Sequence, residues 1–532
     1  MAGFIASLLQ GLDLIGLSAC VGGLGFIPAV LTPRGISAKK LLVRPAGGLI
    51  ILGALTVTGA ELGIVLTQAY GLASEFGRWP WEALVASGFL RARVARAGLA
   101  VPLAVVAFRI RKHPAAHVPW CVAVLSGVSL LVCGGWLTHA VSRLEGGAAL
   151  IAITVLHQLG AVLWAGGLLH LLALRRTLWR SGTDREWWPQ ALAHFSRLAL
   201  LAVAVLAGAG LTLGARYVGD WQNLVGTSYG VMLLTKTILL ATALGLAAAN
   251  RRMIRRWQRR GETHGIQETV PALVEVEAAL ILIALLSAVS LTTLPPAVDI
   301  AGQRATLAQV VGVFSPHWPQ LVPPPRSGAI TTYTSPLDTF ASPTDGDRWQ
   351  SNFNHNVAGL LVLLIAVVAI LDRTGRVGWA RHWPLLFLGL AVFLFLYASP
   401  EAWPIGREGF WGQLVVPTVL QHRLATPLVI LLALFEWRVQ VGGLGGTRWR
   451  FGFPILAVVG GALLLTHTHT GFPTREAFLI EVSHNLLGLL AVLVGAGRWL
   501  ELRLQGAPGR LGGIVWRTCL MGIGFVLLFY RE

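Results

Sequence analysis

Long apolar runs separated by short loops recur along the whole chain. A transmembrane helix needs about 20 consecutive apolar residues, and the chain of 532 residues contains about 14 runs near that length. Charged residues make up only 12% of the chain, against about 25% in soluble domains. The pattern predicts an all-α, polytopic integral membrane protein whose helices form a bundle. The predicted spans cover approximately residues 4–32, 46–71, 95–110, 118–140, 148–173, 193–218, 228–250, 270–293, 354–372, 383–399, 413–437, 452–468, 478–500 and 512–529.

Basic residues gather in every second loop between these runs. The densest cluster, Arg251–Arg260, follows the seventh run, and similar clusters follow the other odd-numbered runs. Loops rich in Lys and Arg stay on the inner side of a membrane, so an even number of spans and outer positions for both termini are expected. The loop after the second run departs from this alternation, because it carries Arg78, Arg91 and Arg93. The net charge of +18 is therefore read as a topology signal, and no nucleic-acid partner is expected.

One loop is much longer than the others and is rich in proline. It lies on the predicted outer side, and a short helix is expected near residues 303–314. Loops of this length are usually functional or act as linkers. We therefore predict three parts: an eight-span membrane domain (residues 1–297), a periplasmic loop (298–353) and a six-span membrane domain (354–532).

Seven histidines share the outer side of the predicted topology. Histidine is costly near hydrocarbon, and neutral imidazole is the commonest metal ligand. Only four cysteines and four methionines occur, so soft sulfur ligation is poorly supported and nitrogen and oxygen ligands are expected. The predicted metal or haem site faces the periplasm and draws on His139, His157, His355, His422, His467, His469 and His484.

These histidines fall into two groups along the chain. His139 and His157 flank one short outer loop, so their rings are expected to be neighbours. In the last six spans, His467 and His469 could bind one ion where the chain becomes extended. The motif His-Asn-x-x-Gly-Leu-Leu occurs twice, beginning at His355 and at His484. The alternative interpretation of His139 and His157 is hydrogen bonding to helix-end carbonyls. For the other histidines it is an ordinary interfacial residue that water or a hydrogen bond satisfies.

Three acidic residues complete the candidate site. Glu476 and Glu481 are close enough in sequence to the histidines to act as ligands or as hydrogen-bond acceptors for them. Glu61 lies inside the second span, where a charged residue marks either an ion or proton relay or a protonated carboxyl bonded to a neighbouring span.

Residues from about 135 to 297 resemble the CopD family of bacterial copper-resistance membrane proteins. The resemblance rests on elements that occur in order: Thr138-His139-Ala140, His157, Leu163 to Leu168 (LWAGGL), Phe195 to Ala199 (FSRLA), Leu224 with Thr227, Tyr229 and Gly230, Leu233-Leu234 with Lys236, Asn250-Arg251-Arg252, Glu277, and Thr293 to Pro296 (TLPP). It implies a multi-pass protein of the bacterial inner membrane that handles copper, often beside a periplasmic CopC-like partner. The 532 residues are not expected to include a CopC-like β-domain.

The sequence carries no Walker A motif, no P-type ATPase phosphorylation motif, no Rossmann glycine fingerprint and no C-x-x-C-H haem attachment site. We therefore expect a protein that is not an enzyme and has no catalytic residues. The leading hypothesis is a protein that binds copper at the outer histidines and transports or delivers it. Two alternatives remain: a redox protein with b-type haem held by paired histidines, and an assembly factor that metallates a membrane copper enzyme.

Overall fold

The computed structural model describes residues 2–31, 40–114, 116–143, 146–182, 184–324, 344–400, 402–406, 409–414, 417–466 and 475–531. Within these ranges the chain is helical and contains no β-strand. Thirteen helices of the described part are long and apolar enough to cross a membrane. The predicted all-α, polytopic membrane bundle is thereby confirmed. The orientation of the termini stays a prediction.

The chain divides into two compact units. The N-terminal unit comprises Ala2–Asp220 and Lys236–Asp299, and the C-terminal unit comprises Trp221–Thr235 and Ile300–Glu532. Helix α9 (Ser228–Arg260) therefore begins in the C-terminal unit and continues in the N-terminal one. Hydropathy does not predict this division of one helix between two units, because it records that a segment is apolar and not which neighbour it packs against.

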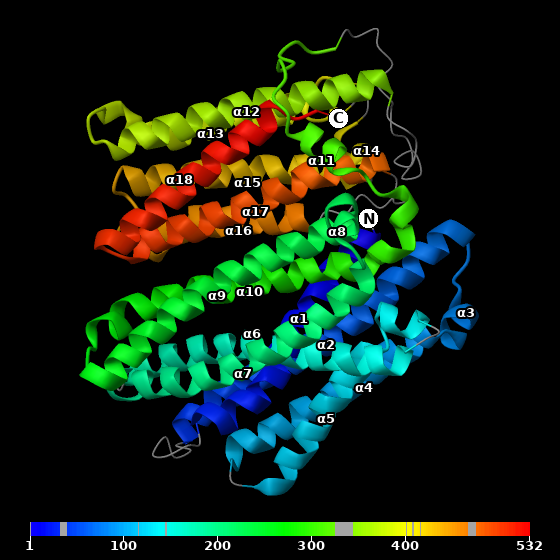
Figure 1. Cartoon of the computed structure of the whole chain (residues 1–532), viewed down its shortest axis with the longest axis vertical. Helices are drawn as coiled ribbons and strands as arrows, with labels where there is room; N and C mark the ends of the chain where they lie inside the picture. Colours follow the sequence, from blue (N-terminus) through cyan, green and yellow to red (C-terminus); the bar gives the residue numbers. More distant parts are fainter. Residues whose placement is uncertain are drawn as a thin grey trace. The chain divides into compact units, whose positions relative to one another are not determined.

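The N-terminal unit is a bundle of long helices (Figure 1). Helix α1 packs against α2, α6 and α10, while α2 packs against α4, and α6 against α7. A side chain on Gly166 of α6 would collide with the backbone of α1 at Ser18. Glycine is therefore required at this crossing, as is common where membrane helices approach closely. The helices are α1 (Ala2–Phe26), α2 (Lys40–Phe76), α3 (Trp81–Ala86), α4 (Gly88–Lys112), α5 (His117–Gly135), α6 (Gly147–Ser181), α7 (Asp184–Val218) and α10 (His264–Thr293).

Helix α4 corresponds to the short predicted span 95–110, and it is not one of the thirteen apolar helices. Its arginines explain the difference, because they are buried in ion pairs inside the unit. Arg93 donates to Glu61 of α2 at 2.9 Å. Arg96 donates to Glu61, to Asp13 of α1 at 2.6 Å and to the carbonyl of Leu130 on α5 at 3.0 Å. The predicted intramembrane charge, Glu61, is thus held between two arginines of a neighbouring helix, and its role as a relay stays a prediction.

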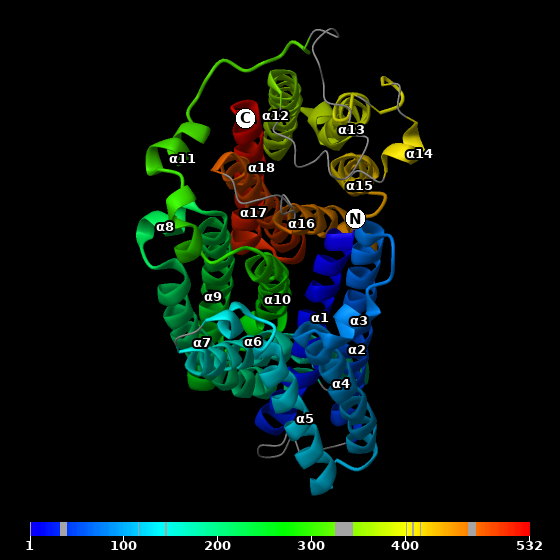
Figure 2. The same cartoon turned by 90° about the vertical axis from the view of Figure 1, so that its right-hand side faces the viewer.

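The C-terminal unit contains a second bundle (Figure 2). Helix α17 packs against α16 and α18, α12 against α18 and α13, and α13 against α15. The predicted short helix near residues 303–314 is confirmed by α11, which Thr306 caps through a reciprocal hydrogen bond with Gln309. The elements are α8 (Trp221–Gly226), α11 (Leu307–Val313), α12 (Asp345–Arg373), α13 (Leu386–Tyr397), α14 (Phe410–Gln413), α15 (Pro417–Gln440), α16 (Gly452–Leu465), α17 (Arg475–Arg503) and α18 (Gly506–Leu528).

Large aromatic side chains fill the middle of this second bundle. Trp383, Phe453 and Trp516 are almost completely buried. The ring centroids of Trp383 lie 5.9 Å from those of Phe453 and 5.6 Å from those of Trp516. Such contacts fix the distances between α16, α18 and the turn before α13, because close-packed aromatic rings leave little room for sliding.

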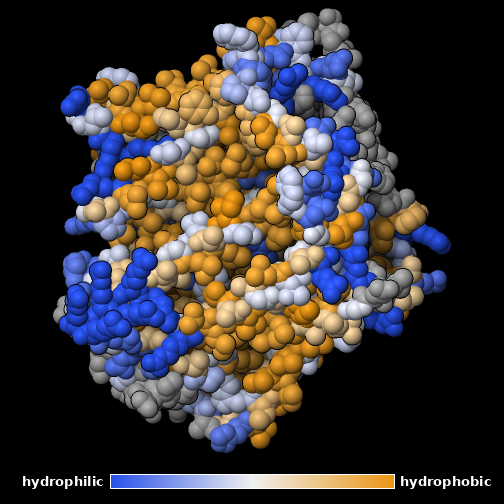
Figure 3. Space-filling view, viewed as in Figure 1, coloured by the Kyte–Doolittle hydropathy of each residue, from blue (hydrophilic) through white to orange (hydrophobic). Residues whose placement is uncertain are grey.

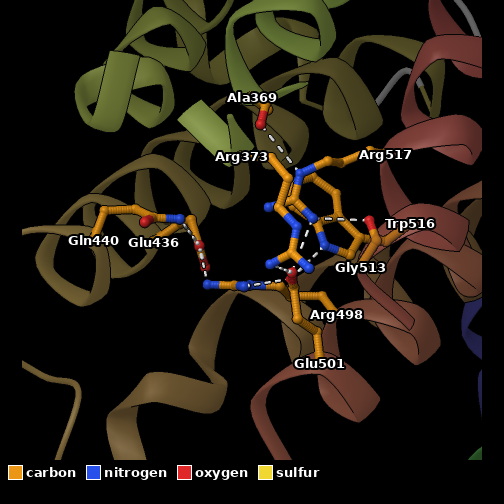
Figure 4. Close-up of polar contacts among 9 residues, drawn as sticks. All are labelled: Ala369, Arg373, Glu436, Gln440, Arg498, Glu501, Gly513, Trp516 and Arg517. Atoms are coloured by element: carbon orange, nitrogen blue, oxygen red, sulfur yellow. Dashed lines mark hydrogen bonds and ion pairs between the residues drawn. The ribbon is translucent and has the colours of Figure 1, made fainter. Parts of the chain in front are cut away.

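A buried charge network ties four helices together (Figure 4). Arg498 of α17 donates to Glu436 of α15 and to Glu501, both at 2.6 Å. Glu501 also accepts from Trp516 at 2.6 Å and from Arg517 of α18 at 2.9 Å. Arg517 in turn donates to the carbonyl of Ala369 on α12 at 3.1 Å. The network is at the C-terminal ends of α12, α15 and α17.

Apolar side chains cover much of the outer surface along the helix bodies, and hydrophilic ones gather toward helix ends, as at the basic end of α9 (Figure 3). Leu200, Leu201 and Leu211 of α7 are more than half exposed in the absence of lipid. Exposed apolar surface of this extent is expected when hydrocarbon rather than water surrounds the helices.

Candidate metal centre

Two predicted ligands, His355 of α12 and His484 of α17, face each other inside the C-terminal unit. Their ring centroids are 5.7 Å apart, and the ring planes meet at 83°. Both rings are partly buried. The two copies of the His-Asn-x-x-Gly-Leu-Leu motif are therefore brought together in space, each supplying one imidazole from the N-terminal half of its helix.

Each of these rings is anchored to its own helix in the same way. Nδ1 of His355 lies 2.8 Å from the carbonyl oxygen of Ser351, and Nδ1 of His484 lies 2.9 Å from that of Ile480. A carbonyl only accepts hydrogen bonds, so Nδ1 carries the hydrogen and the lone pair of the neutral ring is on Nε2. Anchoring one ring nitrogen on a carbonyl is the usual way of orienting a metal-binding histidine.

The ring of Tyr530 packs against both imidazoles. Its ring stacks on His355 with centroids 3.9 Å apart, and it meets the ring of His484 edge-on at 5.9 Å. Asn356, which is fully buried, donates to the carbonyl oxygens of Leu527 at 3.1 Å and Tyr530 at 3.0 Å. The residue next to His355 thus positions the aromatic ring that covers it.

His422 of α15 belongs to the same group. Its Nδ1 lies 3.1 Å from the hydroxyl oxygen of Ser399, and its ring is close enough to those of His355 and His484 for electrostatic interaction. Its side chain is exposed. Three predicted ligands therefore gather at one end of the C-terminal bundle.

The remaining predicted residues of this unit cannot be placed with the same detail. His467 and His469 are outside the described residues, and so is the side chain of Glu476. Glu481 is buried on α17, three residues before His484. Among the described residues, no three His, Cys, Asp or Glu side chains converge closely enough to hold a metal ion. A metal site that has further ligands besides His355 and His484 therefore stays a prediction.

The two histidines of the N-terminal unit contact backbone carbonyls of other helices. Nε2 of His139 lies 3.2 Å from the carbonyl oxygen of Leu291 on α10. Nδ1 of His157 lies 3.1 Å from that of Leu206 on α7. Both contacts agree with the alternative interpretation of these two histidines as partners of backbone carbonyls. Leu291 lies near the end of α10, whereas Leu206 lies in the body of α7. A joint metal site of the two rings stays a prediction.

Sequence reasoning missed the residues that support the paired rings. Tyr530 is near the end of the last apolar run, where an aromatic residue is ordinarily an interfacial anchor. Asn356 and Asn485 did carry a signal, since asparagine follows histidine in both motif copies. Ser399, which contacts His422, had none.

The fold and the histidine group define a polytopic α-helical membrane protein with imidazoles gathered in a bundle of six long helices. Residues 189–291 match the family model described as Copper resistance protein D, which confirms the CopD-like character found in the sequence. The chain is also 30% identical over 176 residues to the Copper transport protein CutJ of Bacillus subtilis (strain 168). That alignment covers 33% of this chain and 31% of the relative, so it spans less than a third of either protein. No solved structure matches the chain.

Proposed function

We propose that this chain is a copper-handling protein of the bacterial inner membrane, which binds copper at periplasm-facing histidines and transports or delivers it. The observation that carries the proposal is the pair of anchored rings, His355 and His484, in a chain with a CopD-like segment. The name of the B. subtilis relative supports the same cargo.

The geometry of the pair suits a single ion. Metal–nitrogen bonds to histidine are about 2.0–2.1 Å long, so two imidazoles on one ion have centroids roughly 5–6 Å apart. The observed 5.7 Å falls within this range. Imidazole is a good ligand for copper, and His422, which interacts electrostatically with both rings, is the candidate for a third ligand. His467 and His469 follow α16 and are the natural candidates to complete the coordination.

We infer a non-enzymatic carrier with copper as its cargo and the lipid bilayer as its surroundings. A periplasmic CopC-like protein is the expected donor or acceptor of the ion. The CopD-like segment lies in the N-terminal unit apart from residues 221–235. His139 and His157 of the same unit are the candidate residues for delivery.

The test is metal content and an absorption spectrum of detergent-purified protein after exposure to copper. A double variant, His355→Ala with His484→Ala, should lose bound copper, whereas His264→Ala should not, because His264 is an exposed residue at the start of α10. Unchanged copper in the double variant would contradict the proposed site. A Soret band in the spectrum would favour the alternative of a protein that binds haem b. Copper binding by the protein without copper transport into vesicles would favour an assembly factor.

A further inference from the structure

A cavity of about 190 Å³ lies inside the N-terminal unit among α6, α7, α9 and α10. Most of its lining is apolar, as in Leu192, Phe195 and Val203. The polar side chains that line it are Trp164, Ser196, Asn250, Arg251 and Glu277. The carboxyl of Glu277 therefore borders an otherwise apolar cavity among membrane-spanning helices.

Glu277 of α10 is only 3% exposed, and neutral groups alone contact its carboxyl. Its Oε1 accepts from the indole N–H of Trp164, and its Oε2 accepts from the amide of Asn250, both at 3.0 Å. The nearby cation, Arg251, donates instead to the backbone and hydroxyl oxygens of Ser196. In the described part of the chain, Glu277 thus has no ion pair, in contrast to Glu61 with its two arginines.

An ionised carboxylate without a counter-charge is strongly unfavourable in such an environment, and protonation removes the charge. Carboxyls that persist within membrane spans commonly serve as proton sites. The single carboxyl cannot form a metal centre with the neighbours described. A proton neutralises the carboxylate by forming one O–H bond and needs no further ligand.

Asn250 supplies a second, independent observation. Its side chain is 5% exposed, and its Oδ1 atom is buried without a hydrogen-bond partner. Turning the terminal amide would replace the donor that now faces Glu277 by this acceptor. One residue can then satisfy both forms of the carboxyl: the amide donates to the ionised form and accepts from the protonated form.

We propose that Glu277 is a proton-exchange site, that Asn250 switches its amide with each proton gained or lost, and that the cavity is the route by which the proton reaches water. The step is a simple transfer in which the O–H bond of the carboxyl breaks or forms and a cavity water takes or gives the proton.

A second, smaller cavity suggests where the other end of the route lies. It measures about 30 Å³ and is lined by His157 and Lys236 together with Trp164, which also lines the larger cavity. The titratable or charged side chains that line the two cavities are thus Glu277 and Arg251 in the larger one and His157 and Lys236 in the smaller one. Trp164 borders both cavities and donates to Glu277 through its indole N–H.

Infrared difference spectroscopy of the full-length protein in lipid, without copper, tests the proposal. We expect a C=O band of a protonated carboxyl that grows on acidification, shifts in D₂O, and disappears in Glu277→Gln. The matched control Glu275→Gln removes a carboxyl two residues away on the same helix, which lines neither cavity, and should keep the band. Glu277→Asp should restore a titrating band, which separates loss of the carboxyl from a folding defect.

Asn250→Leu should keep the band but move it toward the frequency of an unbonded acid, because the acceptor is gone. A band that survives Glu277→Gln unchanged would overturn the proposal. So would a Glu277 band that fails to shift in D₂O over hours, because that carboxyl would not exchange its proton. The readout needs no copper, so it is independent of the proposed cargo.

Discussion

The ring of Tyr530 lies flat on the imidazole of His355, with centroids 3.9 Å apart and 23° between the planes. A stack of this kind limits the rotation of the imidazole about its side-chain torsions. The same tyrosine is bonded through its carbonyl to Asn356, the next residue on α12. The orientation of one candidate ligand is therefore set by contacts between two helices that are far apart in sequence.

Removing the stacked ring should weaken copper binding without removing a ligand. Tyr530→Ala is expected to lower copper affinity about 10–100-fold, the range typical for groups that orient a metal ligand. Tyr530→Phe keeps the stack and should bind nearly as well as the wild type. Competition with a copper chelator of known affinity measures both. Equal losses in the two variants would mean that the hydroxyl, and not the stack, is important.

Asn356 should contribute more to stability than an asparagine bonded only within its helix. Asn356→Ala removes the amide that donates to the carbonyls of Leu527 and Tyr530 and the oxygen that accepts from the backbone N–H of Gln320. A buried polar group left unsatisfied costs about 1–3 kcal/mol. Asn354→Ala is the control, because Asn354 only accepts from Gln350 one turn earlier. Thermal unfolding in detergent should show a clear drop in Tm for Asn356→Ala alone. A similar drop in both would contradict the assigned role.

The buried pair Glu436–Arg498 should respond strongly to removal of one partner. Arg498→Met leaves Glu436 and Glu501 without a shared cation and should destabilise the protein by about 3–5 kcal/mol. Adding Glu436→Gln should recover part of this loss, because one uncompensated charge is then gone. The exposed pair Arg260–Glu262 is the control, and Arg260→Met should have little effect on Tm. A double variant less stable than Arg498→Met would contradict this account.

The crossing of α1 and α6 should tolerate no side chain at Gly166. Gly166→Ala is expected to destabilise the bundle by about 1–3 kcal/mol, since the added methyl meets the α1 backbone and not a flexible side chain. Gly208→Ala on α7 faces open space and should be neutral or mildly stabilising, because alanine favours the helix. Tm and size-exclusion profiles measure both. Equal behaviour of the two variants would mean that the crossing is loose.

Hydropathy was sufficient to predict the helices, because a lipid environment requires long apolar segments with internally bonded backbones. It could not anticipate how α4 accommodates Arg93 and Arg96, since their partners Glu61 and Asp13 come from other helices. The histidine pair was partly predictable from the repeated motif. Tyr530 was not, because stacking across helices leaves no local pattern in sequence.

The proposed proton-exchange site at Glu277 is a second feature that hydropathy alone could not predict. Glu277 appeared in the sequence as one element of a family resemblance, and its position in an apolar run gave no partner. Only the packing of α6 and α9 against α10 shows that its carboxyl meets Trp164 and Asn250 and, within the described residues, no cation. A helix sequence reports which residue is charged, whereas the neutralisation of that charge depends on the neighbouring helices.

The charge network at the C-terminal ends of α12, α15 and α17 has a mechanical consequence. These helices carry His355, His422 and His484 toward their other ends. Arg498 joins the far ends of α15 and α17, and the pair Arg373–Glu501 joins that of α12 to them. A rod clamped at one end moves most at the free end. Small tilts that draw the imidazoles together or apart should therefore pivot about the clamped ends, so that the spacing of the rings changes while the network keeps its contacts.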